Sequence, residues 1–180
     1  MIRKAVLAAI AFSLVLAPLG AALAADPDIE KHKSCKFCGM EREKWNFSRV
    51  YLEYDDGSTE GTCGIHCAAV DLALNIDKSP TTIWVADYGT KQLIDAEKAV
   101  WVIGGAKQGV MTKRAKWAFA DTAAAEAFVK ENQGTLATFD EAIKGAYQDM
   151  YEDTKMIRER RAAKRKAAAE QKAKEAAPAK

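Results

Sequence analysis

The sequence has 180 residues, a formal net charge of +2 and 49% hydrophobic residues, which fits one domain with a sizeable core. The charge is uneven, because Lys and Arg gather in residues 155–180 and leave the preceding part acidic. A nucleic-acid-binding domain would interleave basic and aromatic residues on its folded body, so no nucleic-acid partner is expected.

The first residues have the pattern of a cleaved signal peptide, which we place at residues 1–24. Arg3 and Lys4 precede an apolar stretch, and small residues at positions 22–24 fit a cleavage site. The apolar stretch is shorter than the roughly 20 residues needed to cross a bilayer, so no integral membrane segment is expected after cleavage. No cysteine directly follows the cleavage site, which argues against a lipoprotein. The sequence therefore predicts a soluble exported protein.

Residues 25–47 form a cysteine-rich segment, and residues 48–98 predict a first unit of two strands, a helix and a strand. Alternating residues on both sides of the turn at 55–58 predict a hairpin. Apolar residues between Ile65 and Ile76 recur at helical spacing, and "TIWVADY" has the composition of a strand.

The same order returns in residues 99–139. The stretches "AVWVIGG", "KWAFA" and "GTLATF" predict strands, and a helix capped by Asp121 or Thr122 precedes the last of them. Each unit alone leaves one sheet face uncovered. We therefore predict an α+β fold of two packed ββαβ units, followed by a long C-terminal helix.

That helix occupies residues 140–180 and has an apolar face only as far as Ile157. Beyond it the Ala- and Lys-rich sequence has strong helix formers but little to bury, which predicts a projecting, solvated basic tail. A weak contact of this tail with a membrane surface or an acidic partner is the alternative interpretation.

All four cysteines lie in two short clusters, Cys35-Lys-Phe-Cys38-Gly-Met40 and Cys63-Gly-Ile-His66-Cys67. The second cluster falls at a predicted helix N-terminus, where the helix dipole favours thiolates. Three interpretations are open at this point. The clusters can form disulfides in an oxidising compartment, or a structural zinc site of four thiolates, or a copper(I) site.

A copper(I) site would give a role to more of these residues than the other two interpretations, because this soft ion binds both thiolates and thioethers. The Cys38-Gly-Met40 step brings two soft donors close together through a tight turn. Met111 lies in a predicted glycine-rich loop and is a further candidate thioether, although core packing explains it equally well. His66, between Cys63 and Cys67, is a candidate ligand or a helix-terminal polar residue.

Enzymatic activity is not expected from this pattern. A thiol–disulfide oxidoreductase that uses Cys35 and Cys38 is a further alternative, but no clear strand leads into "CKFC" and no helical pattern directly follows it. A Cys and His pair without a recognisable oxyanion hole or substrate pocket also gives no support for nucleophilic catalysis.

The "CKFCGM" motif, the repeated ββαβ order and the block "FADTAAAEAFVKENQGTLATFDEAI" together resemble the NosL family, the accessory proteins of nitrous oxide reductase. The resemblance covers about residues 35–143. It implies a periplasmic copper(I)-binding metallochaperone that delivers copper to an exported copper enzyme, with Cys38 and Met40 as the first-choice ligands. Cys35, the second cysteine cluster and the basic tail are additions to the family pattern.

Overall fold

The computed structural model describes residues 26–176. The signal peptide predicted at residues 1–24 lies outside this range. The elements in chain order are α1 (Pro27–Lys31), β1 (Val50–Tyr54), β2 (Thr59–Thr62), α2 (Ile65–Leu74), β3 (Pro80–Ala86), β4 (Leu93–Asp95), β5 (Val100–Ile103), β6 (Lys116–Phe119), α3 (Thr122–Asn132), β7 (Thr135–Ala137) and α4 (Phe139–Ala176). Within residues 26–176, every helix is too short or too polar to cross a membrane.

The strands form two antiparallel sheets with the same internal order. The first sheet has the order β2-β1-β3-β4 and the second has the order β6-β5-β7. In each sheet the first strand in sequence is central, paired on one side with its hairpin partner and on the other with the strand that follows the helix. The predicted α+β class is confirmed, and β4 is an additional strand that the sequence did not indicate.

Side-chain caps fix where the helices of the second half begin. The Asp121 side chain accepts a hydrogen bond from the backbone N–H of Ala124 at the start of α3. Before α4, the Glu141 carboxylate accepts from the backbone N–H of Thr138, and the Thr138 hydroxyl oxygen accepts from the N–H of Glu141. This reciprocal pair satisfies donors that an uncapped helix leaves free.

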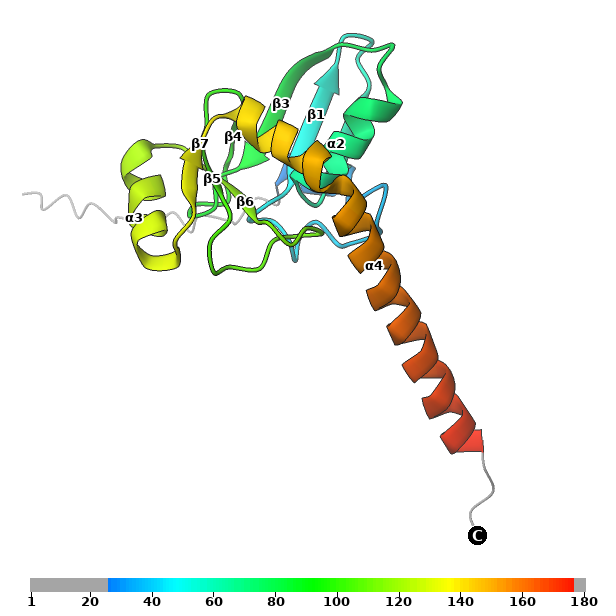
Figure 1. The fold of residues 1–180 in the computed structure, drawn as a ribbon. Coiled ribbons are helices and arrows are strands. Elements are labelled where there is room, and N and C mark those ends of the chain that lie inside the picture. Colours follow the sequence, from blue (N-terminus) through cyan, green and yellow to red (C-terminus); the bar gives the residue numbers. More distant parts are fainter. Residues whose placement is uncertain (1–25, 177–180) are drawn as a thin grey trace, which may run out of the picture.

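The first part of α4 packs against both halves of the body and joins them (Figure 1). Ala142 and Ala146 are buried in a core cluster with Leu52, Ala69 and Trp101, which come from both halves. The small side chains on α4 allow its backbone to approach the sheet and α2 closely. Asp149 adds an ion pair with the buried side chain of Lys116 on β6, with a nitrogen–oxygen distance of 2.8 Å.

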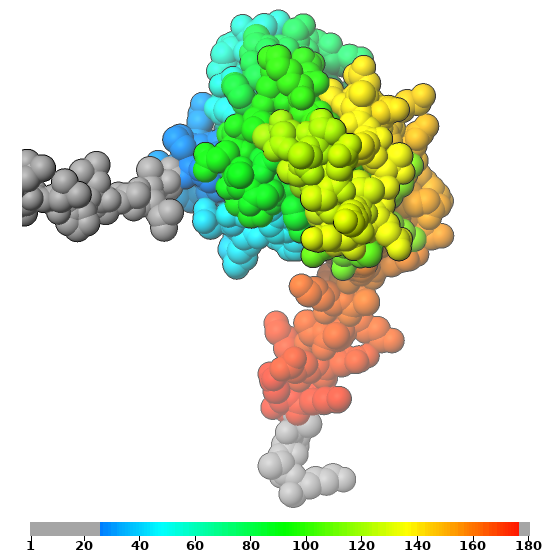
Figure 2. Space-filling model, turned by 90° about the vertical axis from the view of Figure 1, so that its left-hand side faces the viewer, coloured from blue at the N-terminus to red at the C-terminus, as the bar shows by residue number. Residues whose placement is uncertain are grey.

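The second part of α4 leaves the body as an isolated arm, which Figures 1 and 2 show projecting away from the globular part. Residues 158–176 are all exposed. At 1.5 Å per residue this arm is about 28 Å long. The prediction of a projecting helix is confirmed. The arm does not pack against the body, because the sequence beyond Ile157 offers no apolar face to bury.

Candidate metal centre

The first cysteine pair lies in a tight loop between α1 and β1. The backbone N–H of Cys35 donates to the carbonyl of Met40 at 2.8 Å, and the N–H of Gly39 donates to the carbonyl of Cys35 at 2.9 Å. Gly39 has a φ of +74°, a conformation that residues with a Cβ adopt only at a cost. The glycine thus allows the chain to reverse between Cys38 and Met40, as the sequence predicts.

The second cysteine pair flanks the start of α2. Cys63 directly follows β2, Gly64 is the N-cap, and Cys67 lies in the first turn of the helix. The helix dipole lowers the cost of a thiolate at this end of α2, but the neighbouring thiols and burial raise the pKa of both Cys63 and Cys67.

The fold brings all four thiols together, although 24 residues of sequence separate the two pairs. The four Sγ atoms lie within 4.8 Å of one another. The Sγ atom of Cys38 is 3.4 Å from that of Cys63, which is in turn 3.7 Å from that of Cys67. All four cysteines are free thiols in the structure. Sulfurs that surround a metal tetrahedrally at about 2.3 Å are separated by about 3.8 Å, so this cluster fits a soft metal ion.

Burial and mutual contact give the four thiols different acidities. Hydrogen bonds from Cys38, Cys63 and Cys67 hold the pKa of the Cys35 thiol well below its usual range. Contacts with Cys35 and Cys38, together with burial, raise the pKa of Cys63. The cluster therefore accommodates one thiolate readily, and further thiolates need a cation to balance their charge. A bound metal cation supplies that charge and displaces the remaining protons.

A buried charge cluster holds the first cysteine loop against the strands. The Arg42 guanidinium is 0% exposed and pairs with the Asp28 carboxylate of α1 at 2.6 Å. It also donates to the backbone carbonyls of Asp28, His32, Thr62 and Val50. Arg49 contacts the same carboxylate at 3.0 Å. This cluster could not be predicted from the sequence, since the spacing of Asp28, Arg42 and Arg49 shows no local sign that they meet.

Cys38 is the least buried of the four thiols and also lines a groove beside the cluster. The groove has a volume of about 850 Å³. We call it the methionine groove, because three thioether side chains line it together with the Cys38 thiol: Met40, Met111 and Met156. Met40 and Met111 lie in loops, as predicted from the sequence. Met156 comes from α4 and was missed, because its helix position carried no sign that it faces a cysteine loop.

Met111 has a backbone conformation that is unusual for its residue type. Its φ is +60°, in the left-handed region, which costs a non-glycine residue about 1–2 kcal/mol. The loop that carries Met111 is held to α4, because the Asp153 carboxylate accepts a hydrogen bond from the backbone N–H of Lys113 at 2.9 Å. The side chain of Met111 thus reaches the methionine groove from a constrained loop.

His66 lies between Cys63 and Cys67 in sequence, but the set of four mutually close ligand atoms does not include it. Its Nδ1 atom is 3.5 Å from the buried Asp153 carboxylate of α4. Burial lowers the pKa of His66 in spite of this neighbouring carboxylate, which favours the neutral imidazole. The helical turn thus directs Cys67 to the thiols and the Nδ1 atom of His66 toward α4.

The fold and the site together define an α+β protein with a centre of four thiols at the edge of its core. The NosL family model matches residues 26–147, and the chain belongs to the NosL family. The resemblance noted in the sequence is therefore confirmed. The matched range contains the four cysteines, Met40 and Met111, and ends before Met156 and the arm of α4.

The crystal structure of the copper chaperone NosL from Shewanella denitrificans has a similar fold. The TM-score is 0.51 and the sequence identity is 21%, over 66% of this chain and 94% of that chain. A likeness at this identity shows the shared fold. None of the curated proteins matches the sequence.

Proposed function

We propose that this protein is an exported, periplasmic carrier of copper(I) that delivers the ion to a copper enzyme. One observation carries the proposal: the Cys38 thiol belongs both to the four-thiol cluster and to the lining of the methionine groove. Thiolates and thioethers are the ligands that copper(I) prefers, and both are present at this one position. Membership of the NosL family and the likeness to a solved copper chaperone agree with this proposal.

Within this proposal, Cys38 and Met40 are the primary ligands on the groove side. Cys35, Cys63 and Cys67 are more deeply buried and supply the remaining thiolates. Met111 stands along the groove as a further thioether. His66 acts beside the site through its contact with Asp153, in place of the direct ligand role that the sequence suggested.

The arrangement of the donors suits transfer better than permanent retention. Copper(I) needs only two to four ligands, so a bound ion can exchange one donor for another without leaving a sulfur environment. The aromatic and apolar residues around Cys35, Cys63 and Cys67 close the inner side of the cluster. Cys38 remains accessible from the groove, so a ligand of the receiving protein can enter there before the carrier's ligands leave.

The receiving protein in this proposal is an exported copper enzyme of the nitrous oxide reductase type, as the family resemblance implies. The carrier itself needs no catalytic group for this task. The predicted signal peptide and the lack of a cysteine at its cleavage site support export as a periplasmic protein without a lipid anchor.

A zinc site with four thiolates is the second candidate, and the sulfur spacing supports it. The separations of 3.4 and 3.7 Å are close to those of a tetrahedral zinc centre. This alternative assigns no role to Met40 or to the groove. The thiol–disulfide oxidoreductase has less support, because the chain turns back after Cys38 instead of beginning a helix, and Cys35 is 2% exposed.

The two metals are distinguished by parallel titrations of the mature, reduced protein under anaerobic conditions. Copper(I) is titrated against a competing chromophoric chelator, and zinc against its own indicator, for the wild type and Met40→Leu. The copper proposal predicts that this substitution weakens copper(I) binding about tenfold or more and leaves zinc binding unchanged. An unchanged copper(I) affinity in Met40→Leu, or bound zinc that added copper(I) does not displace, would support the zinc site instead.

A further inference from the structure

The positive charge of the α4 arm is concentrated beside the candidate metal centre. Residues 158–166 contain six Lys and Arg residues and one Glu, whereas residues 167–176 contain two Lys and two Glu. All of these side chains are exposed. The cationic part is therefore the half of the arm nearest to the body, and the far half is electrically balanced.

This basic stretch forms one wall of the methionine groove. Arg160, Arg161 and Lys164 of α4 line the groove together with Cys38 and Met40. The Arg161 guanidinium donates a hydrogen bond to the backbone carbonyl of Cys38 at 3.3 Å. The arm is thus connected directly to the loop that carries the most accessible thiol.

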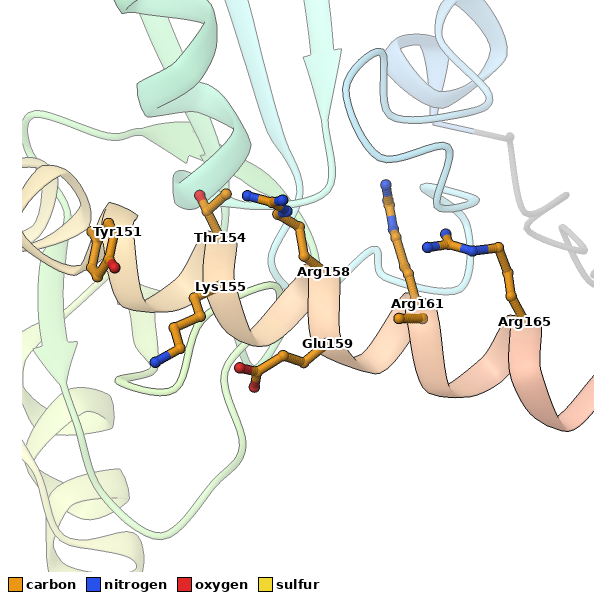
Figure 3. Close-up of a pocket in the computed structure, with 8 residues that line it drawn as sticks. Tyr151, Thr154, Lys155, Arg158, Glu159, Arg161 and Arg165 are labelled. Atoms are coloured by element: carbon orange, nitrogen blue, oxygen red, sulfur yellow. The ribbon is translucent and has the colours of Figure 1, made fainter.

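A second hollow continues the same basic surface along the other side of Arg161. It has a volume of about 710 Å³, and its lining includes Arg158, Arg161 and Arg165 together with Lys155 and Glu159. Figure 3 shows these three arginines on the side of the helix that faces the cysteine loop, whereas Lys155 and Glu159 point the other way. The two hollows share Arg161, and basic side chains outnumber the one acidic residue, Glu159, in their combined lining, which includes Cys38.

We infer that this surface is a docking site for an acidic segment of the protein that receives the metal. The inference rests on the proposed copper function, because it names the chemistry of the receiving partner. Carboxylates of the segment would pair with Arg160 and Lys164 along the wall. A soft donor of the segment would then lie next to Cys38 and Met40, where the exchange of ligands takes place.

Two observations favour an acidic protein segment over an anionic membrane. The arm has no apolar face for insertion into lipid, since its uncharged positions beyond Ile157 are mostly alanine. The charge also lines a concave groove against the body, where a flat bilayer meets fewer of the cationic groups than a chain segment does. Electrostatic complementarity of this kind raises the association rate and fixes the orientation of the partner.

The test compares two variants of the full mature chain that lose the same charge. Arg160→Gln/Lys164→Gln removes two positive charges from the groove wall, and Lys172→Gln/Lys174→Gln removes the two positive charges of the far half of the arm. Glutamine preserves helix propensity at all four exposed positions. Arg161 is left intact, because it contacts the cysteine loop. The probe is a fluorescent synthetic peptide in which two methionines are flanked by aspartates and glutamates, with binding followed by anisotropy.

The peptide is expected to bind the wild type in a salt-dependent manner and the groove variant roughly fivefold more weakly. The far variant is expected to change binding by less than about twofold, because Lys172 lies about 12 Å beyond Lys164 along the helix, more than a Debye length. Peptides with Gln and Asn in place of the acids are expected not to bind.

Equal effects of the two variants, or no effect of either, would overturn the inference. Vesicles containing anionic phospholipid and a sedimentation measurement of oligomeric state are run in parallel. Sedimentation with vesicles that depends on Arg160 and Lys164, or self-association that depends on them, would assign the surface to a membrane or to a second copy and reject the acidic partner.

Copper(I) affinity is measured separately for each variant. Peptide binding without copper(I) binding would refute the copper function alone, and the reverse would refute the docking site alone.

Discussion

The Sγ atom of Cys38 lies 3.4 Å from the Sγ atom of Cys63, and this contact joins the N-terminal loop to the start of α2. One of the two sulfurs is accessible from the methionine groove, and the other is fully buried. The pair therefore connects the side of the centre where ligands can exchange to the side that the core protects.

The neighbouring residues Cys67 and His66 should respond differently to substitution. Cys67→Ser removes a sulfur of the four-thiol cluster and is expected to weaken copper(I) binding by about 1.4 kcal/mol or more, a factor of ten. His66→Gln is expected to have a smaller effect, because its Nδ1 atom faces Asp153. Chelator competition under anaerobic conditions measures both. A larger loss in His66→Gln than in Cys67→Ser would show that the imidazole binds the metal directly.

Gly39→Ala should reduce both stability and metal affinity. Gly39 has a φ of +74° and no atom within 4 Å of an added Cβ, so the cost is backbone strain of about 1–2 kcal/mol. Gly57 in the β1–β2 turn is a matched control, with a φ of +78° and the same open surroundings. Both variants should lower the free energy of unfolding in urea by similar amounts. Only Gly39→Ala should weaken copper(I) binding, and an equal loss in Gly57→Ala would contradict this interpretation.

Arg42→Met should destabilise the fold strongly, by about 3 kcal/mol or more, because it leaves part of a buried ion cluster uncompensated. Four backbone carbonyls also lose a donor. Urea unfolding followed by tryptophan fluorescence measures the change. Lys44→Met is the control, since this exposed lysine pairs with the exposed Glu41 and its loss should change stability by less than about 0.5 kcal/mol. A loss below about 1 kcal/mol in Arg42→Met would contradict the structural role of the cluster.

Acid should weaken the attachment of α4 to the body. Burial alone would raise the pKa of Asp149, but hydrogen bonds from Arg114 and Lys116 hold it below its ordinary value of 3.8. Because the folded state has the lower pKa, the stabilisation is complete at pH values above the ordinary pKa and is lost as the pH falls through the lower, folded value. Asp149→Asn should be less stable than the wild type at pH 7, and this difference should shrink below about pH 4. Urea midpoints measured at several pH values check this, and a difference that is constant with pH would refute it.

Local patterns in the sequence were sufficient for most of the secondary structure. Alternation predicted the β1–β2 hairpin, and apolar spacing and capping residues predicted α2 and α3 at nearly their observed limits. The loss of an apolar face after Ile157 predicted the projecting arm. These features depend on residues close together in the chain, so local sequence patterns are enough to predict them. The three-residue strand β4 was missed, since so short a strand is defined mainly by its pairing with β3.

A site for a soft metal ion could also be predicted, because Cys38-Gly-Met40 and the second cysteine cluster group thiol and thioether side chains in short stretches of sequence. That the two clusters share one centre was decided by tertiary structure. Arg42 and Asp28 are 14 positions apart in the sequence, and their pair holds the first loop against β1 and β2. The direction of His66, the placement of Met156 and the basic wall of the groove depend likewise on where α4 packs. Such contacts arise from burial and long-range pairing, which leave no periodic pattern in the sequence.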